Sequence, residues 1–152
     1  AEPTAVPAEP ASDTAEYDLF CNILALEGSS TYGYDSYLAV ASVIMNQVAS
    51  PKYPNTVTGV LSYPGRFSTY SKAKAGDVSA SRLNANVYQA ASDAYYNGVR
   101  NLPAYVIAFI TPSAYETNVA KGGSFSKMVV YEIDGNKVSY GAVWCYYAAD
   151  AR

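Results

Sequence analysis

The first half of the chain repeats apolar residues at the spacing of buried helices. Apolar side chains recur every three or four positions from residue 15 to Glu27, and the spacing returns over residues 36–49 and 84–97. A short helical turn is also predicted at 57–61. Each of these elements is preceded by a polar residue suited to cap it: Asp13 or Thr14, Asp35, Thr56 and Asn84. The pattern predicts helices in this half, followed by a loop from the turn at 63–65 to about Ser81.

The pattern changes after about residue 100. Residues 105–110, 128–133 and 138–146 are short runs rich in β-branched and aromatic residues. The sequence Asp-Gly-Asn at 134–136, between the last two runs, is a strong hairpin turn. Helices first and strands last predict an α+β fold, with a small antiparallel sheet or hairpin after the helices.

The first fourteen residues differ in composition from the rest. They hold three of the eight prolines, together with Ala and Glu, and almost no large apolar side chain. Such a segment cannot bury a core. We therefore divide the chain into a disordered tail or linker at 1–14 and one domain at 15–152. The tail fits a tether of an exported protein, and no Lys or Arg precedes Lys52, so the basic start of a signal peptide is missing.

Charge and composition exclude several classes of function. The 152 residues carry a formal net charge of −3, with no histidine and with basic residues scattered singly. We therefore expect no nucleic-acid partner, and no apolar run approaches the ~20 residues that a membrane span needs. Without histidine, catalytic triads and His-ligated zinc are excluded, so we expect no metal and no cofactor. Acid–base chemistry must use carboxylates, Lys or Tyr.

Tyrosine dominates the aromatic residues, with sixteen Tyr against four Phe and one Trp. Its flat apolar face and polar tip suit a half-wet groove for sugars, and equally a Tyr-rich surface of an exported protein. Three tyrosines are candidates for the groove, with surface packing as the alternative: Tyr63, Tyr105 and Tyr146.

Two cysteines, Cys21 and Cys145, lie near the two ends of the domain. A disulfide between them would close most of the chain and would suit an exported protein. The alternative is that Cys21, on the apolar face of the first helix, is a buried thiol.

Glu27 stands apart from the other acidic residues. It follows the apolar residues 23–26 directly and precedes a flexible Gly-Ser-Ser-Thr stretch, which places a carboxyl at the end of a buried helix beside an open loop. Partial burial and the negative end of the helix dipole both favour the protonated form of such a carboxyl. A protonated Glu in a groove can donate the proton that glycoside cleavage requires. The alternative is a Glu that caps the helix or forms a salt bridge at its end.

Four segments resemble the catalytic domain of the spore cortex-lytic cell wall hydrolases, in order and at compatible spacing: residues 21–30, 38–48, 50–60 and 63–68. They include Cys-Asn-Ile-Leu-Ala-Leu-Glu before the Gly-Ser-Ser stretch, a Pro-x-aromatic-Pro-x-Thr motif at 51–56, and Arg-Phe-Ser at 66–68 in place of Gln-Phe-Ser. A weaker similarity occurs at residues 107–112.

The resemblance implies a lysozyme-like α+β fold and a bacterial enzyme that is secreted or associated with the cell wall or spore. Members of this family are lytic transglycosylases that cleave peptidoglycan between N-acetylmuramic acid and N-acetylglucosamine. Glu27 matches their catalytic glutamate, which protonates the leaving oxygen and then accepts the proton of the muramyl 6-hydroxyl as a 1,6-anhydro ring closes. That reaction needs neither a second carboxylate nor a cofactor.

The resemblance and the tyrosine candidates together give a set of expected substrate-binding residues: Tyr63, Arg66, Phe67, Ser68, Tyr105, Thr111 and Tyr146. Phe67 is equally suited to the core, and Arg66 is suited to a muramyl carboxylate. We expect a monomer whose partner is the peptidoglycan glycan strand.

The sequence also departs from the family pattern. Glu-Gly-Ser-Ser-Thr at 27–31 replaces Glu-Ala-Arg-Gly-Glu, Gln47 replaces an Arg, Arg66 replaces a Gln, and the late His has no counterpart. Two alternatives to the transglycosylase therefore stay open. One is a muramidase that hydrolyses the same bond, with Asp35 or Glu116 assisting a water molecule. The other is a relative that has lost turnover and binds glycan strands.

Overall fold

The structure, a computed structural model, describes residues 11–140 and 143–151. Most of the tail predicted at 1–14 lies outside the described residues. Residues 11–14, however, form the first turn of helix α1 (Ala11–Glu27), so the cap predicted at Asp13 or Thr14 is wrong. The sequence after Pro10 contains neither proline nor glycine until Gly28, and the helix therefore extends beyond the apolar repeat that predicted it.

Four more helices follow in the first two thirds of the chain: α2 (Gly33–Ala49), α3 (Val57–Ser62), α4 (Tyr70–Ala75) and α5 (Ala85–Asn97). The caps predicted for α3 and α5 are confirmed, because Thr56 Oγ1 accepts a hydrogen bond from Gly59 N at 3.0 Å and Asn84 Oδ1 accepts one from Val87 N at 3.1 Å. Asp35 does not cap α2, which begins two residues earlier. Helix α4 lies where we expected only a loop, since six residues are too few to show a helical repeat.

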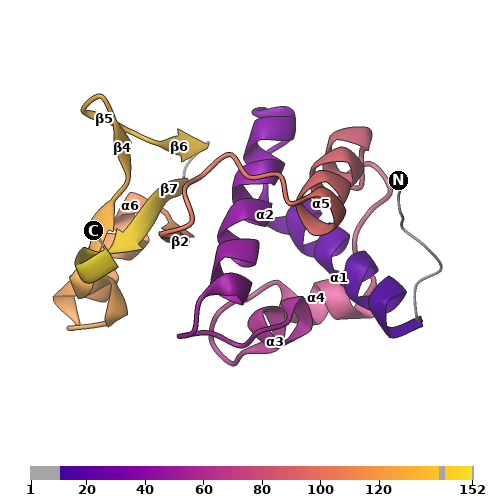
Figure 1. The fold of residues 1–152 in the computed structure, drawn as a ribbon, viewed down its shortest axis with the longest axis horizontal. Coiled ribbons are helices and arrows are strands. Elements are labelled where there is room, and N and C mark those ends of the chain that lie inside the picture. Colours follow the sequence, from indigo (N-terminus) through magenta and orange to yellow (C-terminus); the bar gives the residue numbers. More distant parts are fainter. Residues whose placement is uncertain (1–10, 141–142, 152) are drawn as a thin grey trace.

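Helix α2 lies at the centre of the molecule, between α1 and α5 on one side and the sheet on the other (Figure 1). Residues on one face, such as Leu38 and Ile44, belong to a large helical cluster shared with α1, α3, α4 and α5. Ala39 and Val43, on another face, belong to a smaller cluster with Leu102, Val106 and Cys145. Because it is covered on two sides, α2 is apolar over most of its surface.

The strands form a small antiparallel sheet around β7 (Val143–Ala148), which pairs with β2 (Val106–Ile110), β3 (Met128–Val130) and β6 (Ser139–Tyr140). Phe109 lies opposite Cys145 in the β2–β7 register. The predicted hairpin is confirmed as β4 (Glu132–Ile133) and β5 (Asn136–Lys137), and its turn has positive φ angles of 53° at Asp134 and 81° at Gly135. The α+β fold class is therefore correct.

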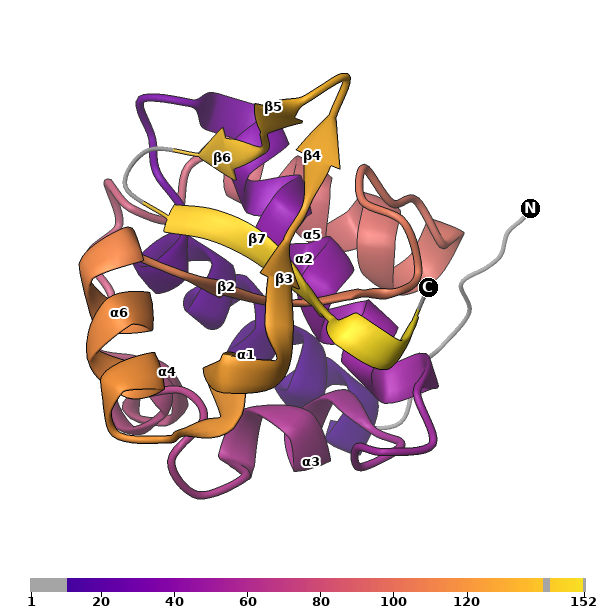
Figure 2. The same ribbon diagram turned by 90° about the vertical axis from the view of Figure 1, so that its left-hand side faces the viewer.

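Helix α6 (Pro112–Ala120) and a 3₁₀ turn, η1 (Ser124–Lys127), connect β2 to β3 and were not predicted. None of the residues of α6 is fully buried, so it lacks the apolar stripe that identifies a helix in a sequence. Viewed from the sheet side, α6 and η1 lie near one end of β3 and the β4–β5 hairpin projects from the other (Figure 2). A second 3₁₀ turn, η2 (Ala149–Ala151), follows β7.

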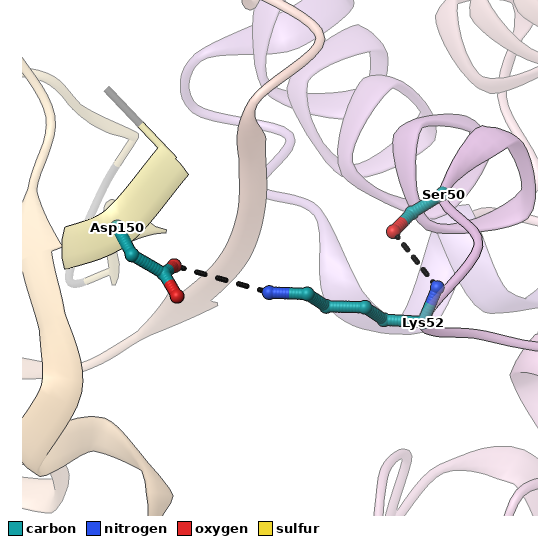
Figure 3. A network of polar contacts seen from close by, with 3 residues as sticks. All are labelled: Ser50, Lys52 and Asp150. Atoms are coloured by element: carbon teal, nitrogen blue, oxygen red, sulfur yellow. Dashed lines mark hydrogen bonds and ion pairs between the residues drawn. The ribbon is translucent and has the colours of Figure 1, made fainter.

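An exposed ion pair joins the loop after helix α2 to the 3₁₀ turn that follows the sheet. Lys52 Nζ, in the loop after α2, lies 3.8 Å from Asp150 Oδ1 in η2, and the backbone N–H of Lys52 donates to Ser50 Oγ at 3.2 Å (Figure 3). Such an exposed pair contributes less than about 1 kcal/mol to stability. The helices and the sheet are held together mainly by the packing of the sheet on α2. Within the described residues, no helix combines the length and apolarity that crossing a membrane would require.

Candidate active site

Glu27 is the last residue of α1, and its half-buried side chain lines a groove of about 470 Å³. Ile23, Leu24 and Ala25, in the turn before it, are at most 2% exposed and fix the end of the helix in the core. Thr69 Oγ1 donates a hydrogen bond of 2.5 Å to Glu27 Oε2. One carboxyl oxygen is therefore held by the protein, and the other has no hydrogen-bond partner among the described residues.

The chain leaves Glu27 along a path that only glycine permits. A Cβ atom on Gly28 would lie 2.8 Å from Cε1 of Tyr37, and closer still to Cδ1. Tyr37 is 2% exposed, and its hydroxyl accepts a hydrogen bond from Asn84 at 3.2 Å, so the ring cannot move aside easily. The N–H of Ser29 then donates to Ser36 Oγ at 2.9 Å. These contacts fix the loop next to the carboxyl.

A tight turn presents Arg66 on another wall of the groove. The N–H of Arg66 donates to the carbonyl of Tyr63 at 3.2 Å, and Gly65 has a φ of 81°, as the third residue of a type II turn requires. The Arg66 guanidinium carbon lies 4.4 Å from the ring centroid of Tyr53 and 4.6 Å from that of Tyr63. Burial raises the pKa of Tyr53, and the charge of Arg66 opposes that rise. The guanidinium thus makes cation–π contacts with two tyrosine rings.

The remaining walls come from α2, β2, α6 and the segment 124–128. Gln47 on α2 donates from Nε2 to the carbonyl of Ile107 at 2.6 Å, while its Oε1 is buried without a hydrogen-bond partner among the described residues. Phe67 and Phe109 lie with ring centroids 6.3 Å apart. Other groove residues are Val43, Tyr53, Gly65, Ser68, Ala108, Ile110, Asn118, Ser124, Phe125 and Met128. The lining therefore combines aromatic and aliphatic surface with a few polar groups, as in sites that bind organic ligands.

The groove contains few charges. Among the described residues that line it, Glu27 is the only carboxylate and Arg66 the only cation. Asp35 and Glu116, the two residues considered as helpers of a water molecule, are not among them. The described residues therefore place one carboxyl group in this groove.

The structure brings together four of the expected site residues and leaves four outside the groove lining. Glu27, Arg66, Phe67 and Ser68 line the groove, and Phe67 also packs against the helical cluster. Tyr63 is close to the groove only through its contact with Arg66.

The other three expected residues have structural roles that explain their positions. Tyr105 packs its ring 5.2 Å from that of Tyr147, and Thr111 caps α6 by accepting a hydrogen bond from Ala114 N at 3.2 Å. Tyr146 is 1% exposed and stacks on Tyr115 at 4.8 Å. Tyr146 is buried because it lies on β7, the strand at the centre of the sheet.

Sequence reasoning missed several residues that contact Glu27 or line the groove. Thr69 directly follows the Arg-Phe-Ser motif, and this position was the available signal for it. Asn118 and Ser124 belong to α6 and η1, whose residues show no repeat, and their places depend on how these elements pack beside β2.

The two cysteines are free and buried, each 2% exposed. The disulfide considered between Cys21 and Cys145 is not formed, because Cys21 belongs to the helical cluster and Cys145 to the smaller cluster on another side of α2. Burial raises the pKa of each thiol to about 12. In the described part of the chain, no group of three or more His, Cys, Asp or Glu side chains is arranged to hold a metal ion.

The described residues thus combine an α+β fold with one carboxyl, that of Glu27, at the end of a helix and within a groove. Residues 32–134, more than half of the chain, match the model of the cell wall hydrolase family. The chain therefore belongs to this family. The matched segment begins after Glu27, so the assignment is independent of that residue.

The structure is similar to the catalytic domain of the germination-specific lytic transglycosylase SleB from Bacillus anthracis, with a TM-score of 0.63 and 21% sequence identity. The similarity covers 92% of this chain and 98% of that domain. At this identity it shows a common fold. No curated protein sequence matches the chain significantly.

Proposed function

We propose that this cell wall hydrolase is a lytic transglycosylase, which cleaves the β-1,4 bond between N-acetylmuramic acid and N-acetylglucosamine in peptidoglycan. The observation that carries the proposal is the single carboxylate, Glu27, among the described residues of the groove. Retaining and inverting glycosidases ordinarily need two carboxyl groups on either side of the bond. A transglycosylase needs one, because the nucleophile is the 6-hydroxyl of the substrate.

In the proposed reaction, Glu27 acts twice. Its protonated carboxyl donates a proton to the glycosidic oxygen as the bond from that oxygen to the muramyl C1 breaks. The resulting carboxylate accepts the proton of the 6-hydroxyl as its oxygen bonds to C1, which forms the 1,6-anhydro ring and restores the acid. No water is consumed. The hydrogen bond from Thr69 holds Oε2, so Oε1 is the oxygen available to the substrate.

The groove supplies the surfaces that a sugar chain requires. Its volume of about 470 Å³ lies within the range of ligand sites, and Phe67 and Phe109 offer apolar faces for sugar rings. Since peptidoglycan lies outside the cytoplasmic membrane, we propose that the protein is secreted or associated with the cell wall. We also propose that it acts as a monomer.

The test is digestion of insoluble vegetative peptidoglycan and of spore cortex by wild type and by Glu27→Gln, with released muropeptides identified by mass spectrometry. We expect 1,6-anhydromuramyl ends from wild type and a loss of rate of about a thousandfold in Glu27→Gln. Asp18→Asn, an exposed acid on the same helix, is the matched control and should retain wild-type rates.

Other products would change the proposal. Reducing muramyl ends that are lost in Glu27→Gln would mean hydrolysis at this site, as in a muramidase. Glycan binding without release of any product, unchanged by Glu27→Gln, would mean a binding module.

A further inference from the structure

We propose that Arg66 makes the groove selective for glycan strands whose muramyl residue carries a free carboxylate, over strands in which that carboxyl has closed into a lactam. This inference rests on the proposed function, because it names the substrate class of the same groove. It concerns binding, however, and can be tested apart from turnover.

The first argument is the way in which Arg66 is held. Its guanidinium contacts the rings of Tyr53 and Tyr63 at 4.4 and 4.6 Å, and the turn from Tyr63 to Arg66 fixes one of these rings beside it. These contacts restrict the side chain, and its guanidinium N–H donors have no hydrogen-bond partner among the described residues. The side chain therefore loses less conformational entropy when it binds an anion than a mobile arginine does.

The second argument is that the protein provides no anion for this cation. The exposed pair between Lys52 and Asp150 is the ion pair seen among the described residues, and Arg66 has no carboxylate partner there. The described groove lining contains no other cation, and its carboxyl, Glu27, already accepts a hydrogen bond from Thr69. The charge of Arg66 is therefore available to a ligand in the groove.

The chemistry of the glycan limits which anion this is. Sugar hydroxyl and N-acetyl groups are neutral, and the charged group of a muramyl residue is the carboxylate of its lactyl substituent or of a short peptide attached to that substituent. Closure of the lactyl carboxyl on the ring nitrogen removes the charge. A charge-assisted hydrogen bond to guanidinium in an exposed groove gives a preference of about tenfold for the carboxylate form.

The test uses Glu27→Gln as the binding-competent background, so that fragments are not cleaved. Dissociation constants are measured by calorimetry for three glycan fragments of equal length, with a free lactyl carboxylate, with a single alanine on the lactyl group, or with muramic lactam. The first two arms distinguish the lactyl carboxylate from a peptide carboxylate. We expect the lactam fragment to bind about tenfold more weakly than the better of the other two.

Three further substitutions in this background identify the residue responsible. Arg66→Gln should reduce the difference between carboxylate and lactam fragments to less than twofold, and Arg66→Lys, which keeps a point charge, should restore part of it. Lys137→Gln is the matched control, because Lys137 also lies over an aromatic ring, 5.4 Å from that of Trp144, but outside the described groove lining. It should leave all three dissociation constants unchanged.

The outcomes separate the inference from the proposed function. Equal affinity for all three fragments, or a preference that survives Arg66→Gln, overturns the role of Arg66 even if wild type makes anhydro products. A preference lost in Arg66→Gln supports it even if wild type only hydrolyses or only binds. Failure to bind any fragment overturns it.

Discussion

The helical and sheet parts of the molecule differ in how firmly they are packed. The helical part buries a large cluster drawn from α1 to α5, with Phe20, Leu24 and Ile44 fully enclosed. The smaller cluster beside the sheet contains five fully buried residues, and most of β2 is only half-buried. The described groove lies between these parts and takes residues from both.

Because of this difference, the acid and the opposite wall of the groove belong to parts of different packing. The acid Glu27 is attached to the firmly packed part, where a small displacement would be costly and where its position is therefore constant. The opposite wall, from β2, α6 and η1, belongs to the less buried part. Segments with few buried apolar contacts open more readily, so we expect any change in the width of the groove to come from this wall.

The largest expected effect compares one buried residue from each part. Phe20→Ala should lower the free energy of unfolding by about 4 kcal/mol, because it leaves a cavity in the helical cluster. Val106→Ala, in the smaller cluster, should cost about 2 kcal/mol, since fewer carbon atoms are lost. Urea unfolding followed by circular dichroism measures both. Because Phe20→Ala removes more carbon atoms, equal losses would contradict the firmer packing of the helical part.

A second prediction concerns the hydrogen bond from Thr69 that holds the carboxyl group of Glu27. Thr69→Val removes the hydrogen bond to Glu27 Oε2 and should lower kcat about tenfold with little change in KM, because the carboxyl is then less well positioned. Thr69→Ser keeps the hydroxyl and should restore most of the rate. If Thr69→Ser is as slow as Thr69→Val, the hydroxyl is not what positions the acid.

The smallest expected effect is a dependence of stability on pH in the helical part. Glu16 of α1 accepts hydrogen bonds from the hydroxyl of Tyr95 at 2.6 Å and from the N–H and hydroxyl of Thr58 at 2.9 and 2.7 Å. Burial acts to raise the pKa of Glu16, but these hydrogen bonds outweigh it and hold the pKa below its ordinary value of 4.5. The stabilisation is therefore complete above that value and is lost as the pH falls through the lowered pKa of the folded state.

Glu16→Gln tests this dependence. The variant should unfold at slightly lower urea concentration than wild type at neutral pH, and the difference should shrink as the pH falls below 4.5. Asp18→Asn, exposed on the same helix, is the control and should give parallel curves. A difference between wild type and Glu16→Gln that does not change with pH would assign the effect to packing instead of charge.

The sequence was a good guide wherever one periodic signal decided the structure. The helix that ends at Glu27, the caps Thr56 and Asn84, and the Asp-Gly turn of the hairpin all follow from local chemistry. Helices α4 and α6 were missed because one is very short and the other has no buried face. A helix of that kind is held by its caps and by packing at its ends, which periodicity does not report.

The candidate site was predictable only where its residues are adjacent in the sequence. Arg66, Phe67 and Ser68 were found because they follow one another in one motif. Tyr105 and Tyr146 were expected at the groove because tyrosine suits sugar, but Tyr105, in the turn before β2, and Tyr146, on β7, contact other aromatic rings. Which face a strand residue uses is set by register, and register could not be read from these short strands.

The close approach of Gly28 to Tyr37 also limits how this protein can vary. Because a Cβ on residue 28 collides with the ring of residue 37, residue 28 can gain a side chain only if the side chain at residue 37 shrinks or moves. Chains that carry alanine directly after the corresponding glutamate should have a smaller or differently placed side chain nine positions further on.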